Sequence, residues 1–175
     1  MRTVVLRVVA LALLLMLALV GVITARTLSR LPDMLVYFAK DTGTAFTLES
    51  VPRVARSGDL EERVSAQVRA LVEGPTRTEA EDGLATNLPA GTRVLGASLD
   101  DGLLTVDLSR EFGSGGGTAS MVGRLNQLYY TLSQPAGVRA VRLEMEGRPL
   151  RVLGGEGIIV DSMWVRDEHG EEPRW

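Results

Sequence analysis

The sequence predicts an α+β fold, in which a mixed or antiparallel sheet is covered by two helices and preceded by an N-terminal transmembrane helix. Apolar residues at helical spacing over residues 57–76 and 119–132 indicate the two helices. Alternating apolar residues on both sides of Asp100-Asp101-Gly102 indicate a hairpin. The predicted order is β-β-α-β-β-α-β. Because helices alternate with hairpins, we expect a single sheet with both helices on one face.

The uncharged apolar stretch over residues 8–25 is the first element of the chain. A helix of this length spans roughly 27 Å at about 1.5 Å per residue, close to the thickness of a hydrocarbon core. We predict an uncleaved signal anchor, because the best cleavage candidate, Ile23-Thr24-Ala25, has a bulky side chain where a small one is needed. A cleaved signal peptide and a soluble protein with a buried N-terminal helix are the alternatives.

The predicted orientation places residues 1–7 in the cytoplasm as a stub and residues 26–175 outside the cytoplasmic membrane, as a single-pass protein. A short stub before one long outer domain is the common arrangement for a signal anchor. Arginines on both sides of the stretch give only a weak orientation signal: Arg2, Arg7, Arg26 and Arg30. The chain contains no cysteine, which excludes a lipid anchor attached through a thiol.

The charge of the outer part argues against nucleic-acid partners. Without Arg2 and Arg7, 17 basic residues stand against 22 acidic ones. Lys40 is the only lysine, and no basic cluster is interleaved with aromatic residues. Since binding to nucleic acid depends on neutralising phosphates, we expect no nucleic acid as a partner. The lack of cysteine also means that the outer domain is stabilised by its core rather than by disulfides.

A linker and two strands open the outer domain. The linker covers residues 26–33, and Pro32 within it prevents the anchor helix from continuing. Strands are predicted over 34–40 and 46–55. Pro52 cannot donate a hydrogen bond to a ladder, so the second strand is expected either to lie at an edge or to break there.

The helix over residues 57–76 has signals at both ends. Asp59 is a typical N-cap residue, and Glu62 three residues later is predicted to complete a capping box. Gly74 suits the C-cap, and Pro75 prevents the helix from continuing. A polar loop is expected over residues 77–83.

A hairpin, a second helix and a further strand complete the folded domain, which we predict over 34–155. The hairpin strands, 94–99 and 103–108, each place three apolar residues on one face: Leu95, Ala97 and Leu99, then Leu104, Val106 and Leu108. The helix over 119–132 carries an apolar stripe, and a strand follows over 137–146. Residues 156–175 are expected to form a C-terminal strand and a polar tail.

The glycine-rich loop has the outline of a nucleotide site, because it lies between a strand and a helix. It consists of Gly113, Ser114, Gly115, Gly116, Gly117 and Thr118. A P-loop requires a lysine that this loop lacks, and the dinucleotide fingerprint requires a glycine where Thr118 stands. The preceding strand is also predicted to be the second arm of a hairpin rather than the first strand of a parallel βαβ unit. We therefore interpret the loop as a turn and keep it only as a weak candidate interaction or ligand surface.

No other group of residues predicts catalysis, a cofactor or a metal ion. The single histidine, His169, lies in the polar tail without the partners of a zinc site or a catalytic triad. Asp100 and Asp101 are expected at an exposed hairpin tip, so we interpret them as turn residues rather than as a catalytic pair of carboxylates. Asp107 is expected to bond to the loop that follows it. The acidic residues within 77–83 lack the spacing of a calcium loop.

Two aromatic residues complete the weak candidate surface. Adjacent residues on a helix point about 100° apart, so Tyr130 is expected to reach the surface beside a buried Tyr129. Trp164 is expected to complete the sheet or, as the alternative, to form an exposed patch for a partner.

Five sequence motifs follow one another in the outer domain: VYFAKDTG at 36–43, ALVEGPT at 70–76, GLATNLPAGTRVLG at 83–96, DGLLTVDLSREF at 101–112 and QLYYTLSQPAGVRAVRLEMEG at 127–147. Together they resemble the GerMN domain, the sporulation and spore germination domain of bacterial envelope proteins, over residues 34–153. The resemblance implies an extracytoplasmic module without known catalytic residues, similar in fold to the ring-building motifs of secretion and sporulation machines.

The anchor and the resemblance together predict a non-enzymatic envelope domain that binds an envelope protein partner or assembles with itself. The alternative is a sensor or binding module for a cell-wall fragment or another small ligand. A cell-wall hydrolase would need clustered carboxylates or a metal site, which the sequence pattern does not provide.

Overall fold

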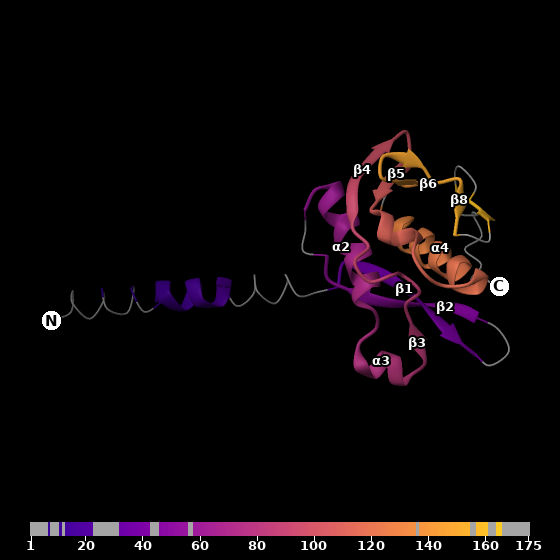
Figure 1. The fold of residues 1–175 in the computed structure, drawn as a ribbon. Helices are drawn as coiled ribbons and strands as arrows, with labels where there is room; N and C mark the ends of the chain where they lie inside the picture. The colour runs from indigo at the N-terminus through magenta and orange to yellow at the C-terminus, as the bar shows by residue number, and fades with distance from the viewer. Residues whose placement is uncertain are drawn as a thin grey trace. The chain divides into compact units, whose positions relative to one another are not determined.

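The computed structural model describes residues 7, 11, 13–22, 32–42, 46–55, 58–135, 137–154, 157–160 and 164–165. It divides into two compact units, Met1–Pro32 and Asp33–Trp175. In the first unit, residues 13–22 are helical, and Figure 1 draws them as the indigo helix. Within the described residues, no helix combines the length and the apolar character that crossing a membrane requires. The predicted anchor over 8–25 lies partly outside the described residues, which cover only 11 and 13–22 of that range.

The second unit has the predicted α+β architecture, but its strands form separate sheets (Figure 1). A three-stranded sheet has the order β2-β1-β3, with β1 (Met34–Asp41), β2 (Phe46–Arg53) and β3 (Leu84–Ala85). A larger sheet has the order β10-β6-β5-β4, with β4 (Val94–Asp100), β5 (Leu103–Leu108), β6 (Ala140–Met145), β10 (Trp164–Val165) and, beside β6, β7 (Arg148–Pro149). A short hairpin pairs β8 (Val152–Leu153) with β9 (Ile158–Ile159). The prediction of a single sheet is therefore wrong.

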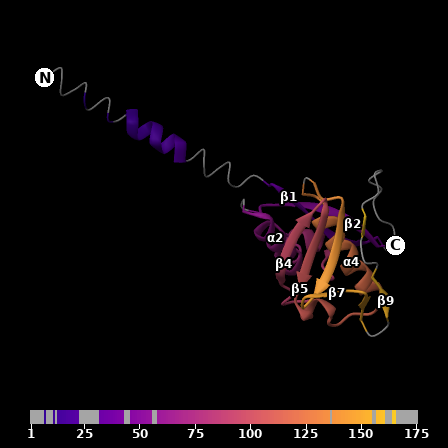
Figure 2. The same ribbon diagram turned by 90° about the horizontal axis from the view of Figure 1, so that it is seen from above.

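The helices are α2 (Leu60–Glu73), α3 (Arg77–Glu81) and α4 (Thr118–Leu132), with a 3₁₀ turn over Arg110–Gly113. β5 and β6 pair in parallel, and α4 is the crossover between them. The expectation that β5 is only a hairpin arm is thus wrong, because β5 belongs both to a hairpin with β4 and to a βαβ unit. In Figure 2, β4 and β5 lie in front of α2 and α4, so both helices cover one face of this sheet.

The predicted N-cap of α2 at Asp59 and its C-cap at Gly74 are confirmed. The Asp59 side chain accepts a hydrogen bond from the Glu62 N–H, and Gly74 takes a positive φ of 81° at the C-cap. A polar loop was expected after it, but α3 forms there instead. Thr76 and Glu79 make a capping box, each side chain bonding to the backbone N–H of the other.

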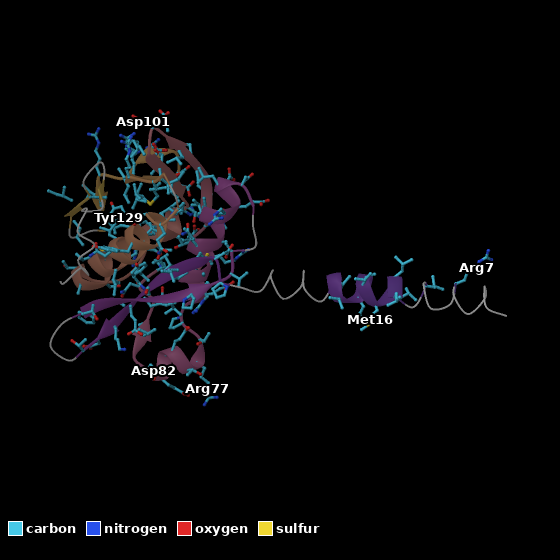
Figure 3. The ribbon with its side chains drawn as sticks, turned by 180° about the vertical axis from the view of Figure 1, so that it is seen from behind. Arg7, Met16, Arg77, Asp82, Asp101 and Tyr129 are labelled. Atoms are coloured by element: carbon cyan, nitrogen blue, oxygen red, sulfur yellow. The ribbon has the colours of Figure 1, made fainter. Side chains whose placement is uncertain are left out.

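The β4–β5 hairpin turns at Asp101 and Gly102, whose positive φ values of 41° and 79° are those of a type I′ turn. Figure 3 shows Asp101 at this tip. The predicted face holds for β5, where Leu104, Val106 and Leu108 are fully buried. It fails in β4 at Leu95 and Leu99, which are 46% and 39% exposed. A bulge between Val94 and Gly96 shifts the register at Leu95.

A single hydrophobic core joins the elements of the second unit. The apolar stripe of α4 is buried in it as predicted: Met121, Leu125, Leu128, Tyr129 and Leu132. It packs with the inward residues of β5 and β6 and with the apolar face of α2. β1 contributes Val36 and Phe38, both fully buried. The core thus holds both larger sheets to the two long helices.

Polar side chains of α4, and Gln134 just beyond its end, complete the free edge of β1. β1 pairs with β3 only at Ala39 and Lys40. Earlier along the same edge, the Tyr37 N–H donates to Thr131 Oγ1 at 3.0 Å, and the Tyr37 carbonyl accepts from Gln127 Nε2 at 3.2 Å. Gln134 Nε2 donates to the Leu35 carbonyl at 3.2 Å. The helix therefore occupies the position that another strand would take, which explains why the smaller sheet ends there.

An ion pair fastens α3 to the edge strand β2. Arg53 Nη1 lies 2.9 Å from Glu79 Oε1, and Nη2 bonds to the other carboxylate oxygen. The guanidinium also lies over the Phe38 ring, 5.5 Å from its centroid. The hydrogen bonds from Arg53 lower the pKa of Glu79 to about 2.

We expect Glu79→Gln to lower the free energy of unfolding by roughly 1–2 kcal/mol at pH 7, because charge-assisted bonds to Arg53 are lost. A depressed carboxyl pKa contributes stability above the unfolded value of 4.5, and this contribution is lost as the pH falls toward 2. Urea unfolding of both proteins at pH 7 and pH 3 measures the effect, which should shrink at pH 3. Glu81→Gln removes only an exposed pair with Arg77 and is the control. An equal difference at both pH values would contradict the assignment.

Candidate functional site

The glycine-rich loop connects the 3₁₀ turn to α4, and residues 114–118 within it are exposed. Gly115 and Gly116 take positive φ values of 65° and 83°, which favour glycine. Gly117 is the N-cap residue of α4 and provides no side-chain cap. The loop therefore makes a sharp turn that depends on its glycines.

The buried guanidinium of Arg124 supports this loop from inside. Arg124 is 2% exposed, and it donates to the carbonyls of Phe112, Gly115 and Asn87. The bonds to Gly115 and Asn87 measure 3.0 and 3.1 Å. Burial lowers the pKa of Arg124 from its ordinary value. Because the Arg124 guanidinium donates to three backbone carbonyls, we interpret the loop as a turn that this side chain braces.

A phosphate site at this loop is not supported by the geometry. The βαβ topology of a dinucleotide site is present, contrary to the sequence-based expectation. The residue chemistry is still missing, because Thr118 replaces the third glycine and Arg124 is committed to backbone carbonyls. The loop matters instead because it leads directly into one wall of a groove.

An apolar groove of about 350 Å³ lies between the start of α4 and the adjoining ends of β1 and β2. Its described lining consists of Ala39, Phe46, Asn87, Ala119, Ser120, Val122 and Gly123. None of these residues is ionisable. Phe46 is 48% exposed at the rim, which is unusual for a large aromatic side chain. The groove can accept an apolar group, but its described walls offer no acid, base or charged nucleophile.

The groove wall is held firmly at Asn87. The Asn87 N–H donates to Gln127 Oε1 at 2.7 Å, while its carbonyl accepts from Arg124. A Cβ atom on Gly123 would lie 2.6 Å from Asn87 Nδ2, so a larger residue could not keep this packing. Close approach of helix and loop therefore shapes the groove.

The fold does not bring together the residues that the sequence suggested as a single candidate surface. Tyr130 is half-buried, and its ring centroid lies 5.6 Å from that of Tyr37 on β1. Trp164 pairs with Val141 in the larger sheet, so its backbone completes that sheet as predicted, while its side chain lies outside the described residues. Gly113 to Thr118 adjoin the groove without lining it. Sequence reasoning missed the groove, although the small residues Ala119 and Gly123 in the first turns of α4 were a signal.

The remaining candidates have structural roles where they are described. Both carboxylate oxygens of Asp107 accept from the Gly147 N–H at 3.0 Å, so its partner is the β6–β7 turn rather than the loop after β5. Asp101 bonds to Arg139 at 2.7 Å and belongs to the hairpin tip. The described residues contain no group of three or more potential metal-ligating side chains. His169 lies outside the described residues.

Comparison with known proteins gives one sequence match and several structural ones. The family described as "Sporulation and spore germination", named Germane, matches residues 35–151. Comparison with curated proteins finds no match.

Three solved structures share the fold at low sequence identity. The tandem GerMN domains of the Bacillus subtilis sporulation protein GerM match with a TM-score of 0.64 and 18% identity, over 80% of this chain and 46% of theirs. The chain thus spans less than half of that tandem structure. The first GerMN domain of the same protein matches with a TM-score of 0.58 and 18% identity, over 77% of this chain and 98% of that domain. A candidate lipoprotein from Clostridium perfringens matches with a TM-score of 0.53 and 19% identity, over 76% of this chain and 86% of its own.

We expect Arg124→Met to destabilise the domain by at least about 2 kcal/mol, because three backbone carbonyls lose their donor in a buried site. Urea unfolding followed by circular dichroism measures this loss. Arg69→Met, on the exposed face of α2, is the control and should stay within about 0.5 kcal/mol of the parent. Wild-type stability in the Arg124 variant would show that the loop does not depend on this side chain.

Proposed function

The chain belongs to the Germane family of sporulation and spore germination domains, and from this premise we propose that it is a non-catalytic interaction module of the bacterial envelope. The GerMN resemblance seen in the sequence is confirmed by the family match. In the proposed function, the domain lies outside the cytoplasmic membrane and docks a protein partner. In this role the domain positions that partner at the membrane surface.

The groove beside α4 carries this proposal. Its described lining is apolar, apart from one amide and one hydroxyl, and it holds no ionisable group. Catalysis by acid–base or nucleophilic chemistry needs such groups within hydrogen-bond reach of a substrate. A half-exposed phenylalanine at the rim is instead typical of a protein contact, since aromatic residues are enriched at interfaces.

The apolar stretch over residues 8–25 supports a membrane anchor in this proposal. Its length suits a hydrocarbon core, and residues 13–22 within it are helical. The similar protein from Clostridium perfringens is described as a candidate lipoprotein, which is consistent with attachment of such domains to membranes. This chain lacks cysteine, so we propose that the helix itself anchors it in a single pass.

A small-ligand sensor is the second candidate function. The groove volume of about 350 Å³ falls within the size range of small-molecule sites. A cell-wall fragment with an apolar group would fit its chemistry. Protein and small-ligand occupants give different results in the experiment below.

The experiment replaces Val122 by a photo-crosslinking amino acid in the full chain, expressed in its own host. Irradiation of intact cells should give a discrete crosslinked band, because Val122 lines the groove. Mass spectrometry of the band identifies the protein partner. The same amino acid at Thr78, on exposed α3, is the control and should not give that band.

Phe46→Ser in the same chain should weaken the Val122 crosslink at least about fivefold, the effect expected from losing one aromatic contact of about 1 kcal/mol. A melting temperature near that of the parent verifies that the variant is folded. If Val122 gives no band above the Thr78 control, protein docking at the groove is refuted. A melting-temperature increase with cell-wall fragments would then favour the sensor function.

A further inference from the structure

The strand β4 forms an edge of the larger sheet, since among the described strands only β5 pairs with it. From Val94 to Leu99 it carries no charge and no proline. Leu95 and Leu99 are 46% and 39% exposed. An uncharged apolar edge with free peptide groups is a ready template for pairing with another chain.

The edges of the smaller sheet are protected in ways that β4 is not. β2 carries Pro52 and the ion-paired residues Glu49 and Arg53. β3 is only two residues long, and side chains of α4 take up the remaining edge of β1. The bulge at Leu95 is the one protective feature of β4, and it leaves a regular register from Gly96 to Asp100.

The hairpin geometry shows which peptide groups of β4 are free. Asp100 and Leu103 flank a two-residue turn, so this pair exchanges both hydrogen bonds. Hydrogen-bonded and non-bonded pairs alternate along an antiparallel ladder. The peptide groups of Ser98 therefore point toward β5, whereas those of Ala97 and Leu99 point to the open edge.

The charges at the two ends of β4 are opposite. Arg93 precedes the strand with a 65% exposed side chain, 3.8 Å from Glu111. Asp100 and the Arg139-bonded Asp101 lie at the other end. Antiparallel pairing of two identical strands brings the basic end of each copy beside the acidic end of the other. Parallel pairing would bring like charges together, which is destabilising. The charge pattern thus fits a second copy of this chain in one orientation.

We propose that two copies of the chain pair through their β4 edges, antiparallel, about a two-fold axis near Ala97 and Ser98. The two larger sheets then form one continuous sheet across the dimer. Such an isologous contact closes on itself and gives a dimer rather than a filament. The inference deepens the proposed interaction function, but it uses a surface that shares no residue with the groove.

The absence of native cysteine allows a direct test by single cysteines. Ser98→Cys and Ala97→Cys are made separately in the full chain, purified in detergent, and oxidised with copper phenanthroline. Opposed residues in an antiparallel pair lie about 4.5–5.5 Å apart between Cα atoms, within the range of a disulfide. We expect at least one of the two to give a covalent dimer as the main product. Ser50→Cys, on the exposed edge strand β2, is the control and should stay monomeric.

A lysine at the edge provides the second arm of the test. Leu99→Lys, added to the cysteine variant that crosslinks, should reduce the covalent dimer at least about tenfold, since edge lysines block strand pairing. Leu35→Lys is a matched control, because Leu35 lies in β1 with 38% exposure, close to that of Leu99. Far-UV circular dichroism verifies that both variants are folded.

The proposal is overturned if both β4 cysteines crosslink no more than Ser50→Cys, or if Leu99→Lys leaves the covalent dimer unchanged. A dimeric mass by light scattering without β4 crosslinking would assign association to another part of the chain and also overturn it. The Val122 photo-crosslink tests docking of a different protein at the groove and does not depend on β4. Failure of the dimer proposal therefore leaves the groove proposal intact, and the reverse also holds.

Discussion

The fold depends on a row of polar side chains along the buried central helix α4. Arg124, Gln127 and Thr131 lie in α4, and Gln134 follows just beyond its end at the same spacing. Each bonds to backbone outside the helix. A buried peptide group without a partner destabilises a fold by about 1–3 kcal/mol, more than an ordinary hydrogen bond contributes on balance. These side chains remove that penalty at β1, at the segment after β3 and at the glycine-rich loop. The two sheets can therefore be separate and still share one core.

The same row of side chains connects the fold to the candidate site. Gln127 and Arg124 fix Asn87 from both sides, and Arg124 also braces the loop that leads into the groove wall. A groove built on such contacts keeps its shape without a bound partner. Recognition there depends on apolar contact, with Asn87 and Ser120 as the polar groups in the described lining. The side chains that stabilise the core of the domain thus also determine the shape of the groove.

Sequence reasoning predicted what depends on local pattern and missed what depends on distant pairing. The caps of α2, the turn at Asp101-Gly102 and the stripe of α4 are each set by residues a few positions apart, and all were found. The parallel pairing of β5 with β6, the bulge at Leu95 and the separation of the sheets depend on which strands meet in space. α3 was missed because it is a single short turn whose signal, Thr76 with Glu79, lies in a polar segment. The groove was missed because its walls come from three segments far apart in the chain.

The helix-to-strand bonds at β1 also set an order of events during synthesis. Tyr37 and Thr131 are 94 positions apart, so the open edge of β1 emerges long before its partners exist. At about 5–20 residues per second, that interval is roughly 5–20 s. The nascent domain therefore exposes the open edge of β1 during this time. A binding factor that shields extended chains would be most useful to it in that interval, before α4 has been made.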